Sequence, residues 1–397
     1  MNQITEKLLH WYNQEKRELP WRFTSEPYAI WVSEIMAQQT QISTLLPYYI
    51  KFIEAFPTIE TLALAPMDQI LKICAGIGYY NRFHNMKKTA EIIMSDFDGQ
   101  MPQEPQTLQK LPGIGAYVAG AISSIAYNKK VPAVDGNVFR VMARLERNEC
   151  DISKAATKNA LTKHLAEIMP DCAGTFNQAL MELGALLCKP KNPLCNQCPL
   201  ADLCKGQDIA HLLPVKSSKI SIKEIDKTIL LICHPSLGIL MRKRSEKLLH
   251  GMWEFYHIDN MLEEKDVLAH MQKLGYTLTQ LIPLGEDSHR FTHLKWNMIG
   301  YMCHVEESFS IMDYDFVPME EIGDLAIPSA FGRFVGDIGR EIIIYRSLIL
   351  RGTCSGKEYL LRIHGGRLIT TSLILRVLAL RLRLAYMLLP AHHISAS

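Results

Sequence analysis

The sequence lacks any run of about 20 uncharged apolar residues, the length that a membrane-spanning helix requires. It also lacks the charged start and apolar core of a secretory signal, because its first residues, MNQITEKLLHWYNQEKRELPW, are polar and amphipathic. These absences disfavour integral membrane proteins and exported proteins. We therefore expect a cytoplasmic protein that does not associate with a membrane.

A strong charge of either sign is also absent, since 43 Lys and Arg face 41 Asp and Glu, a formal net charge of +2. Residues 1–215 carry 21 charges of each sign, and residues 216–340 carry 14 basic and 18 acidic ones. The surplus of basic residues lies in residues 341–397, which carry 8 basic and 2 acidic residues. Nucleic-acid binding through bulk charge is therefore disfavoured, and any such binding must use local patches and backbone amides.

An alternating strand pattern is missing from residues 1–205, where apolar residues recur every three or four positions and proline and glycine mark short connections. This pattern predicts an all-α domain of about ten helices. Residues 206–226 are polar and rich in lysine, which is typical of a linker between domains. Short β-type runs separated by turns predict a small α/β or α+β domain over residues 227–340. Residues 341–397 form an atypical basic tail, to which we assign no function.

Six of the ten cysteines are scattered, and in a cytoplasmic chain we expect them to be reduced. The other four follow the spacing C-x6-C-x2-C-x5-C within 17 residues, too dense a group for unrelated buried thiols. Spacing alone favours zinc, since C-x2-C is its usual half-site, but a cubane iron–sulfur cluster also takes four cysteines. Either centre is expected to be structural, because four protein ligands leave no open position for a substrate. The four are Cys188, Cys195, Cys198 and Cys204.

The segment LPGIGAYVAGAI (111–122) places Gly113 and Gly115 in a tight turn directly before an apolar helix. Glycine permits positive φ and a close backbone approach, and the free amides at a helix start can bind a phosphate. This is the sequence form of a helix–hairpin–helix, which holds DNA without reading its sequence. An ordinary helix turn is the alternative for a G-x-G pair alone, and the flanking Leu-Pro and AGAI favour the hairpin.

Two carboxylates stand out by their surroundings. Glu34 lies in the otherwise apolar segment YAIWVSEIMAQQTQI (28–42), where burial would raise its pKa and make it a proton donor near neutral pH. Asp135 precedes a glycine in VPAVDGNVFRVMAR (131–144), where a turn or a helix N-cap is the simpler explanation. Taken singly, each favours a structural role. Together they supply the acid and the second carboxylate that cleavage of an N-glycosidic bond needs, on a base flipped out of the duplex.

Six features in order along residues 1–340 resemble the MutY family of adenine DNA glycosylases, part of the helix–hairpin–helix superfamily that also contains endonuclease III. They are VSEIMAQQTQI, GIGYYNR, LPGIGAYVAGAI, VDGNVFRV, FNQALMELGALLC and the cysteine spacing. The resemblance implies an all-α glycosylase domain with an iron–sulfur cluster loop, followed by an α/β domain similar to MutT (Nudix) proteins. It implies base-excision repair by a monomer acting on double-stranded DNA with adenine opposite 8-oxoguanine or guanine, held at the nucleoid through that DNA.

The resemblance also assigns catalytic roles. Glu34 would protonate N7 of the adenine, and Asp135 would stabilise the cationic sugar or trap it transiently, with support from Asn137. Tyr117 would form a hydrogen bond near the catalytic aspartate. Lyases similar to endonuclease III carry a lysine at this hairpin position, which forms a Schiff base and cleaves the strand. A phenol cannot do so, and the chain is therefore expected to remove the base and leave the strand uncut.

Further residues acquire binding roles from the same resemblance. Gln39 and Tyr79 would enter the duplex near the lesion and help to unstack it. The four cysteines would hold a [4Fe–4S] cluster, and here the resemblance decides against zinc. The residues that would line the adenine pocket are Arg17, Leu19, Trp21 and Glu182.

The second domain resembles the MutY C-terminal domain in GMWEF (251–255) and HRFTHLKW (289–296). The catalytic box of Nudix enzymes is missing from residues 259–275, so the carboxylates that hold magnesium for pyrophosphate hydrolysis are absent there. The implied role is recognition of 8-oxoguanine by Phe291, Thr292 and His293. Two positions depart from the family pattern: Thr292 replaces a serine of many relatives, and Tyr256 replaces a proline. Without the resemblance, the preferred interpretation of FTH (291–293) would be an ordinary β-strand whose histidine is hydrogen-bonded within the fold.

The sequence disfavours three other functions. A thymine-excising mismatch glycosylase can also have tyrosine at the hairpin, but such proteins generally lack the second domain. A lyase of the endonuclease III type is disfavoured by Tyr117. A scaffold that clamps mismatches without chemistry is disfavoured because both carboxylates are present.

Overall fold

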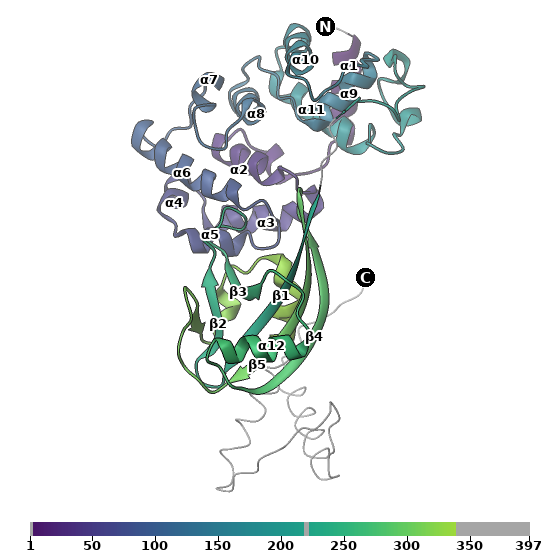
Figure 1. The fold of residues 1–397 in the computed structure, drawn as a ribbon. Coiled ribbons are helices and arrows are strands. Elements are labelled where there is room, and N and C mark those ends of the chain that lie inside the picture. Colours follow the sequence, from purple (N-terminus) through teal and green to yellow (C-terminus); the bar gives the residue numbers. More distant parts are fainter. Residues whose placement is uncertain (1–2, 218–221, 339–397) are drawn as a thin grey trace, which may run out of the picture. The chain divides into compact units, whose positions relative to one another are not determined.

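The first half of the chain folds into eleven α-helices in a computed structural model that describes residues 3–217 and 222–338 (Figure 1). This agrees with the predicted all-α domain of about ten helices. The described residues belong to the unit Met1–Ile338, and the predicted basic tail, 341–397, lies outside them. The helices are α1 (Gln3–Glu15), α2 (Pro27–Ala37), α3 (Ile42–Ala55), α4 (Ile59–Leu64), α5 (Met67–Ile73), α6 (Asn81–Asp96), α7 (Pro105–Leu108), α8 (Ala116–Tyr127), α9 (Gly136–Leu145), α10 (Ala155–Ile168) and α11 (Ala173–Leu186).

Local sequence signals set several helix ends. Proline stands at the start of α2 and α7, where its fixed φ suits a first turn and its missing N–H costs nothing. Thr58 and Thr61 form a reciprocal capping box at the start of α4. Helix α8 ends at Asn128, which adopts the left-handed conformation that asparagine tolerates. These signals confine each helix to the segment that its apolar spacing indicates.

Helix α11 packs closely against α8 and α9 at two glycines. A Cβ on Gly174 would lie 2.6 Å from the carbonyl oxygen of Ser124 in α8, and one on Gly184 would lie 2.6 Å from the Cβ of Asn137 in α9. Neither position has room for a larger side chain. This close packing brings the N-terminus of α9 against α11, within a core formed largely by α1, α9, α10 and α11 around residues such as Leu8 and Phe176.

A six-stranded mixed sheet forms the second part, with strand order β4-β5-β1-β3-β2-β6. Strands β1 and β5 run parallel, and the other pairs are antiparallel. Helix α12 (Glu264–Lys273) packs on the apolar core of this sheet through Val267 and Met271. The strands are β1 (Lys223–His234), β2 (Gly238–Lys243), β3 (Trp253–Ile258), β4 (Leu278–Arg290), β5 (Leu294–Val305) and β6 (Asp315–Val317).

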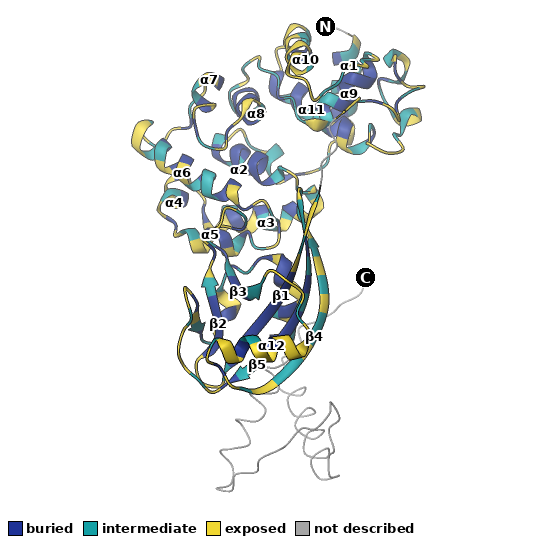
Figure 2. Cartoon of the chain, viewed as in Figure 1, coloured by how far each residue is buried: buried dark blue, intermediate teal, exposed yellow. Residues whose placement is uncertain are grey.

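Burial separates the central strands from the edges, as Figure 2 shows. Residues 227–233 of β1 are all buried, as expected for a central strand with both faces covered. Strand β1 begins at Lys223, so the last residues of the predicted linker 206–226 already pair with β5. Among the described residues, no helix has both the length and the apolar character needed to cross a lipid bilayer.

Candidate active site

Glu34 lies on a deeply buried helix, α2. In α2 every residue from Ile30 to Met36 is buried, and the Glu34 side chain is enclosed with them. The hydroxyl of Tyr117, in the first turn of α8, donates a hydrogen bond to Oε2 of Glu34. Burial raises the pKa of Glu34 to about 7, with the Tyr117 hydrogen bond opposing the rise and the charge of Asp135 adding to it. A carboxyl group on an apolar helix is thereby half protonated near neutral pH.

Asp135 caps a helix, which is the structural role that its sequence allowed. Its Oδ1 accepts a hydrogen bond of 2.7 Å from the backbone N–H of Val138, which makes it the N-cap of α9. Its Oδ2 accepts 2.7 Å from the side-chain amide of Asn137, the supporting contact expected of that residue. Its charge raises the pKa of both Glu34 and Tyr117, so the structure brings these three groups together.

Tyr117 forms its hydrogen bond close to Asp135, and the partner is the other carboxylate of the site. Its hydroxyl bonds to Glu34, and its second contact is the sulfur of Met181 at 3.5 Å. Both oxygens of Asp135 already accept hydrogen bonds from its own helix start, whereas Glu34 presents an oxygen directly to α8. Burial and the two nearby carboxylates raise the pKa of Tyr117 well above its ordinary value, so the phenol stays protonated and acts as a donor.

Asn137 also connects the site to the cysteine loop. Its side-chain oxygen accepts a hydrogen bond of 2.8 Å from Nη2 of Arg140, a buried residue one turn further along α9. Arg140 donates in turn to the carbonyl oxygens of Gly184 at 2.8 Å and Cys188 at 2.7 Å. A continuous path of hydrogen bonds thus runs from Asp135 through Asn137 and Arg140 to Cys188.

Glu182 is fully buried on α11 and is saturated by two arginines. Arg17 donates to Oε1 through its backbone N–H and Nε, both at 2.9 Å, and Arg22 donates to both oxygens at 2.8 and 2.6 Å. Burial alone would raise the pKa of Glu182, but these hydrogen bonds lower it to about 2. The guanidinium of Arg22 also lies 5.5 Å from the ring centre of Tyr12. The carboxylate therefore fixes both guanidinium groups.

Arg22 is a residue that sequence reasoning missed. Its positive charge opposes the rise in the Glu34 pKa, so it lies within electrostatic range of the acid. The signal was its place directly after Trp21 in RELPWR. Of the other pocket residues predicted in that motif, Leu19 is buried in extended backbone, and Trp21 is half-buried with its ring edge-on to Tyr49 at 4.7 Å.

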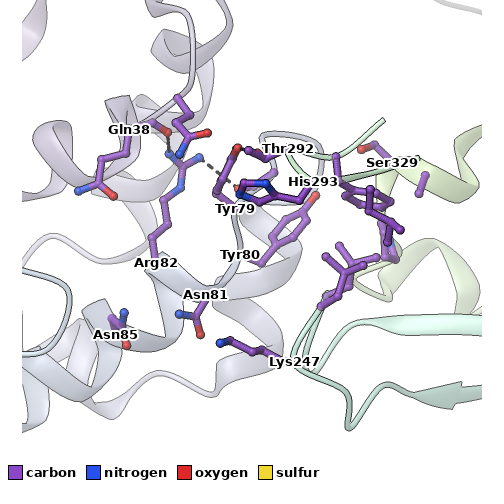
Figure 3. A pocket seen from close by; sticks show the side chains of 18 of the residues that line it. Gln38, Tyr79, Tyr80, Asn81, Arg82, Asn85, Lys247, Thr292, His293 and Ser329 are labelled. Atoms are coloured by element: carbon purple, nitrogen blue, oxygen red, sulfur yellow. Dashed lines mark hydrogen bonds between the residues drawn. The ribbon is translucent and has the colours of Figure 1, made fainter. Parts of the chain in front are cut away.

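A cavity of about 780 Å³ gathers the residues predicted to enter the duplex and to recognise the opposite base (Figure 3). Gln39 and Tyr79 line it together with Gly113, and so do Phe291, Thr292 and His293. The hydroxyl groups of Tyr79 and Thr292 form a hydrogen bond. Both Gln39 and Tyr79 have left-handed backbones, with φ of 57° and 52°. Of the four predicted DNA-binding residues, Gln39, Tyr79 and Gly113 therefore share one cavity, and Gly115 does not line it.

The hairpin before α8 needs only one of its two glycines. Gly113 has φ +77°, and a Cβ there would lie 2.8 Å from the Cβ of Asn85. Gly115 has an ordinary φ of −87° and open space around it, so the expectation that both glycines serve positive φ was wrong for this one. Gly115 is the N-cap of α8 and offers no side-chain acceptor, which leaves the first amides of the helix without a capping partner.

The four clustered cysteines line one small, apolar cavity, and none forms a disulfide. Two short turns, Cys195–Gln197 and Ala201–Leu203, hold the loop, and Arg144 donates to the carbonyl oxygen and the sulfur of Cys188 at 3.3 and 3.4 Å. Four thiols around one space, with a cation beside them, fit an anionic cysteine-ligated group. No three His, Cys, Asp or Glu side chains among the described residues converge as ligands of a single ion would.

The FTH segment is a turn between strands. Strand β4 ends at Arg290 and β5 begins at Leu294, and the N–H of Phe291 donates to the carbonyl of Leu294 at 2.7 Å. The Phe291 ring meets the ring of Trp296 edge-on at 4.9 Å, which fixes the base of the turn. Tyr256, the other departure from the family pattern, lies in the core, and its hydroxyl contacts His270 of α12 at 3.0 Å. The alternative of a plain strand for FTH is therefore not what the structure contains.

Three models of known families match separate parts of the chain. Residues 32–167 match the model of the HhH-GPD superfamily base excision DNA repair proteins, residues 188–204 match the iron–sulfur binding domain of endonuclease III, and residues 228–336 match the NUDIX domain. These matches confirm the predicted fold class and the predicted [4Fe–4S] cofactor. The residues that would hold the cluster are Cys188, Cys195, Cys198 and Cys204.

Two curated proteins to which the chain is similar are adenine DNA glycosylases. The chain is 37% identical over 292 residues to that of Buchnera aphidicola subsp. Baizongia pistaciae, covering 72% of this chain and 82% of the relative. It is 35% identical over 352 residues to the Homo sapiens protein, covering 72% of this chain and 64% of that longer protein. Among solved structures, a thermostable thymine-DNA glycosylase is 28% identical with a TM-score of 0.46, covering 52% of this chain and 95% of that one.

Proposed function

The chain belongs to the adenine DNA glycosylases, as its motifs predicted, and we propose that it removes adenine paired with 8-oxoguanine or guanine without cutting the strand. The observation that carries this proposal is Glu34, a buried acid whose pKa lies near 7, with Asp135 and Tyr117 beside it. We also propose that the protein acts as a monomer in the bacterial cytoplasm, held at the nucleoid by its DNA.

The proposed reaction follows from the hydrogen bonds of these groups. Tyr117 occupies Oε2 of Glu34, which leaves Oε1 to hand a proton to N7 of an extruded adenine. The bond from the base to C1′ then breaks, and its electron pair leaves with the neutral base. Asp135, oriented by Val138 and Asn137, faces the positive charge on the sugar until water adds at C1′ and loses a proton.

The proposed adenine pocket rests on the arginine pair around Glu182. Both carboxylate oxygens of Glu182 already accept hydrogen bonds from the arginines, so the role of Glu182 is to hold Arg17 and Arg22 in place. Their N–H groups are donors that a purine ring nitrogen can accept from. Arg17 is the more exposed of the two and is therefore the more accessible to a base.

A base-release assay tests the proposed function directly. Duplexes with adenine opposite 8-oxoguanine, adenine opposite guanine and thymine opposite guanine are compared, with the full chain and with a chain ending near residue 340. We expect free adenine from the first two and no thymine. Borohydride trapping is expected to capture no enzyme–DNA adduct, because Tyr117 has no amine. Thymine release, or a trapped adduct, would assign the chain to another branch of the superfamily.

Replacing Tyr117 with phenylalanine is expected to shift the pH dependence of base release. The Tyr117 hydrogen bond stabilises the ionised form of Glu34, so its loss raises the Glu34 pKa further. A hydrogen bond to a charged group contributes about 1.5–3 kcal/mol, which corresponds to roughly one to two pH units. The alkaline fall in the single-turnover rate should move upward by that amount.

Tyr127→Phe is the matched control for this change. Its hydroxyl donates to the carbonyl of Met101 from the other end of the same helix. Its pH profile should equal that of the wild type. An unchanged profile in Tyr117→Phe would show that the phenol does not act on the acid.

Replacing Thr292 with valine is expected to reduce discrimination between the opposing bases. The change keeps the branched shape and removes the hydroxyl that faces the cavity. Base release opposite 8-oxoguanine should slow by roughly five- to tenfold, the effect of one lost hydrogen bond, while release opposite guanine changes little. Thr279→Val, at the far end of β4, is the control. Equal slowing with both duplexes would contradict a role in recognition.

A further inference from the structure

Arg82, in the first turn of α6, is a buried cation without a carboxylate among its hydrogen-bond acceptors. Its Nη1 donates to the carbonyl oxygens of Ile35, Met36 and Gln38 at 3.2, 2.8 and 2.5 Å. Its Nη2 donates to the hydroxyl of Thr40 at 3.0 Å and to the carbonyls of Ile77 and Gly78 at 3.2 and 3.3 Å. Burial lowers its pKa to about 10, which still leaves it charged at neutral pH.

The acceptors belong to two segments far apart in the sequence. One is the end of α2 with the turn that follows it, residues 35–40, and the other is the loop before α6, residues 76–80. Figure 3 shows the Arg82 side chain reaching toward Gln38 beside Tyr79. Within the described part of the chain, one other direct hydrogen bond joins these segments, from the Thr40 hydroxyl to the carbonyl oxygen of Ile77 at 3.5 Å. A single planar guanidinium therefore joins the two segments.

Each segment carries one residue in a strained backbone conformation. Gln39 and Tyr79 both have positive φ, which costs a residue with a side chain on the order of 1 kcal/mol. Both residues line the cavity proposed to receive the duplex. Such strain persists only where surrounding contacts enforce it. The hydrogen bonds of Arg82 to Gln38, Thr40 and Gly78 lie directly next to the two strained residues.

The same guanidinium also caps the C-terminus of α2, the helix that carries Glu34. The carbonyls of Ile35 and Met36 belong to the last turn of α2, where a positive charge is favourable. Glu34 precedes Ile35 directly. One side chain thus fixes the end of the acid's helix and both cavity-lining turns in a common frame.

We propose that Arg82 is a positioning residue that holds the turns of Gln39 and Tyr79 in their DNA-inserting conformations before DNA arrives. The inference rests on the proposed function, since it assumes that these turns act on the duplex. Because the turns are already ordered when the protein folds, the free energy of ordering them is not required during base extrusion. Arg82 touches neither the base nor the sugar in this role, and its effect is expected on extrusion and not on bond cleavage.

Arg82→Lys tests the proposal because lysine keeps the positive charge at the end of α2 and loses the planar fork. Base release under single-turnover conditions is compared for adenine in a mismatched duplex and adenine in a single-nucleotide bulge, where it is already unstacked. We expect about 30-fold slower release from the duplex and less than about threefold from the bulge, with an unchanged pH profile. Hydrogen exchange of residues 35–40 and 76–80 in the DNA-free protein should quicken.

Two further variants keep the test decisive. Thr40→Val removes one acceptor and the Thr40–Ile77 bond but leaves the end of α2 intact, and it should slow duplex release several-fold. Lys87→Met, on the same helix, removes a bond of 2.7 Å to the carbonyl of Ala63 away from the cavity and should change neither substrate. Equal loss on duplex and bulge, or unchanged exchange in both segments, would overturn the proposal. Failure of the wild type to release adenine would overturn the proposed function instead, because the exchange measurement needs no DNA.

Discussion

Replacing Glu34 with glutamine is expected to abolish base release while leaving duplex binding largely intact. The amide keeps the size of the carboxyl group and its acceptor for the Tyr117 hydroxyl, but it has no proton to give. General acid catalysis contributes roughly 10²–10⁴-fold, and the loss should fall in that range. In the wild type, the rate should fall as pH rises above about 7, where Glu34 ionises. Single-turnover release and a binding isotherm on the same duplex measure both parts.

The same substitution is expected to stabilise the fold at alkaline pH. The folded pKa of about 7 lies above the ordinary 4.5, so the folded state prefers the protonated acid. That contribution is complete below pH 4.5 and is lost as pH rises through 7. At about 1.4 kcal/mol per pKa unit, glutamine should gain roughly 3 kcal/mol in the free energy of unfolding above pH 8 and little at pH 4.

Glu54→Gln, on the exposed face of α3, is the control and should alter neither release nor the pH dependence of stability. Retained base release in Glu34→Gln would remove the foundation of the proposed mechanism. A stability gain without loss of activity would show that Glu34 is buried but not the acid.

Replacing Cys198 with serine is expected to release the cluster and destabilise the whole helical part. Hydrogen bonds from Arg140 and Arg144 hold one end of the loop 188–204, and cysteine-ligated centres commonly supply the folding energy of such loops. The wild type should be brown, contain iron and absorb near ~400 nm, and the variant should lose all three properties. Its thermal midpoint should fall by several degrees for each kcal/mol lost, with proteolysis beginning within the loop.

The exposed Cys172 provides the matched control, since Cys172→Ser removes a thiol on the same helical part without touching the loop. It should keep the iron content, the colour and the thermal midpoint of the wild type. Zinc in place of iron in the purified protein would contradict the assignment of the cluster and leave the glycosylase mechanism untouched.

The sequence predicted the elements better than it predicted their contacts. The apolar segment around Glu34 indicated a buried acid, and Asp-Gly before an apolar helix indicated an N-cap, because both signals are local. The partner of Tyr117, the role of Arg22 and four of the six acceptors of Arg82 depend on residues tens of positions away. No spacing rule contains that information, and only the packing of the helices supplies it.

Two smaller differences have the same origin. Gly115 looked equivalent to Gly113 in the motif, but only Gly113 approaches Asn85 of a neighbouring helix. Strand β1 extends back to Lys223 because β5 offers a parallel partner there, which a polar, lysine-rich segment does not reveal. In both cases the local conformation is determined by a neighbouring element, α6 or β5, and the local sequence alone is compatible with either conformation.

The hydrogen-bonded path from Asp135 through Asn137 and Arg140 to Cys188 connects the iron-binding loop to the proposed catalytic carboxylate. Injury to the inorganic centre would be transmitted through three polar contacts to the carboxylate that is proposed to face the sugar. A cell short of iron would then hold molecules of this enzyme in which that carboxylate is no longer held in position.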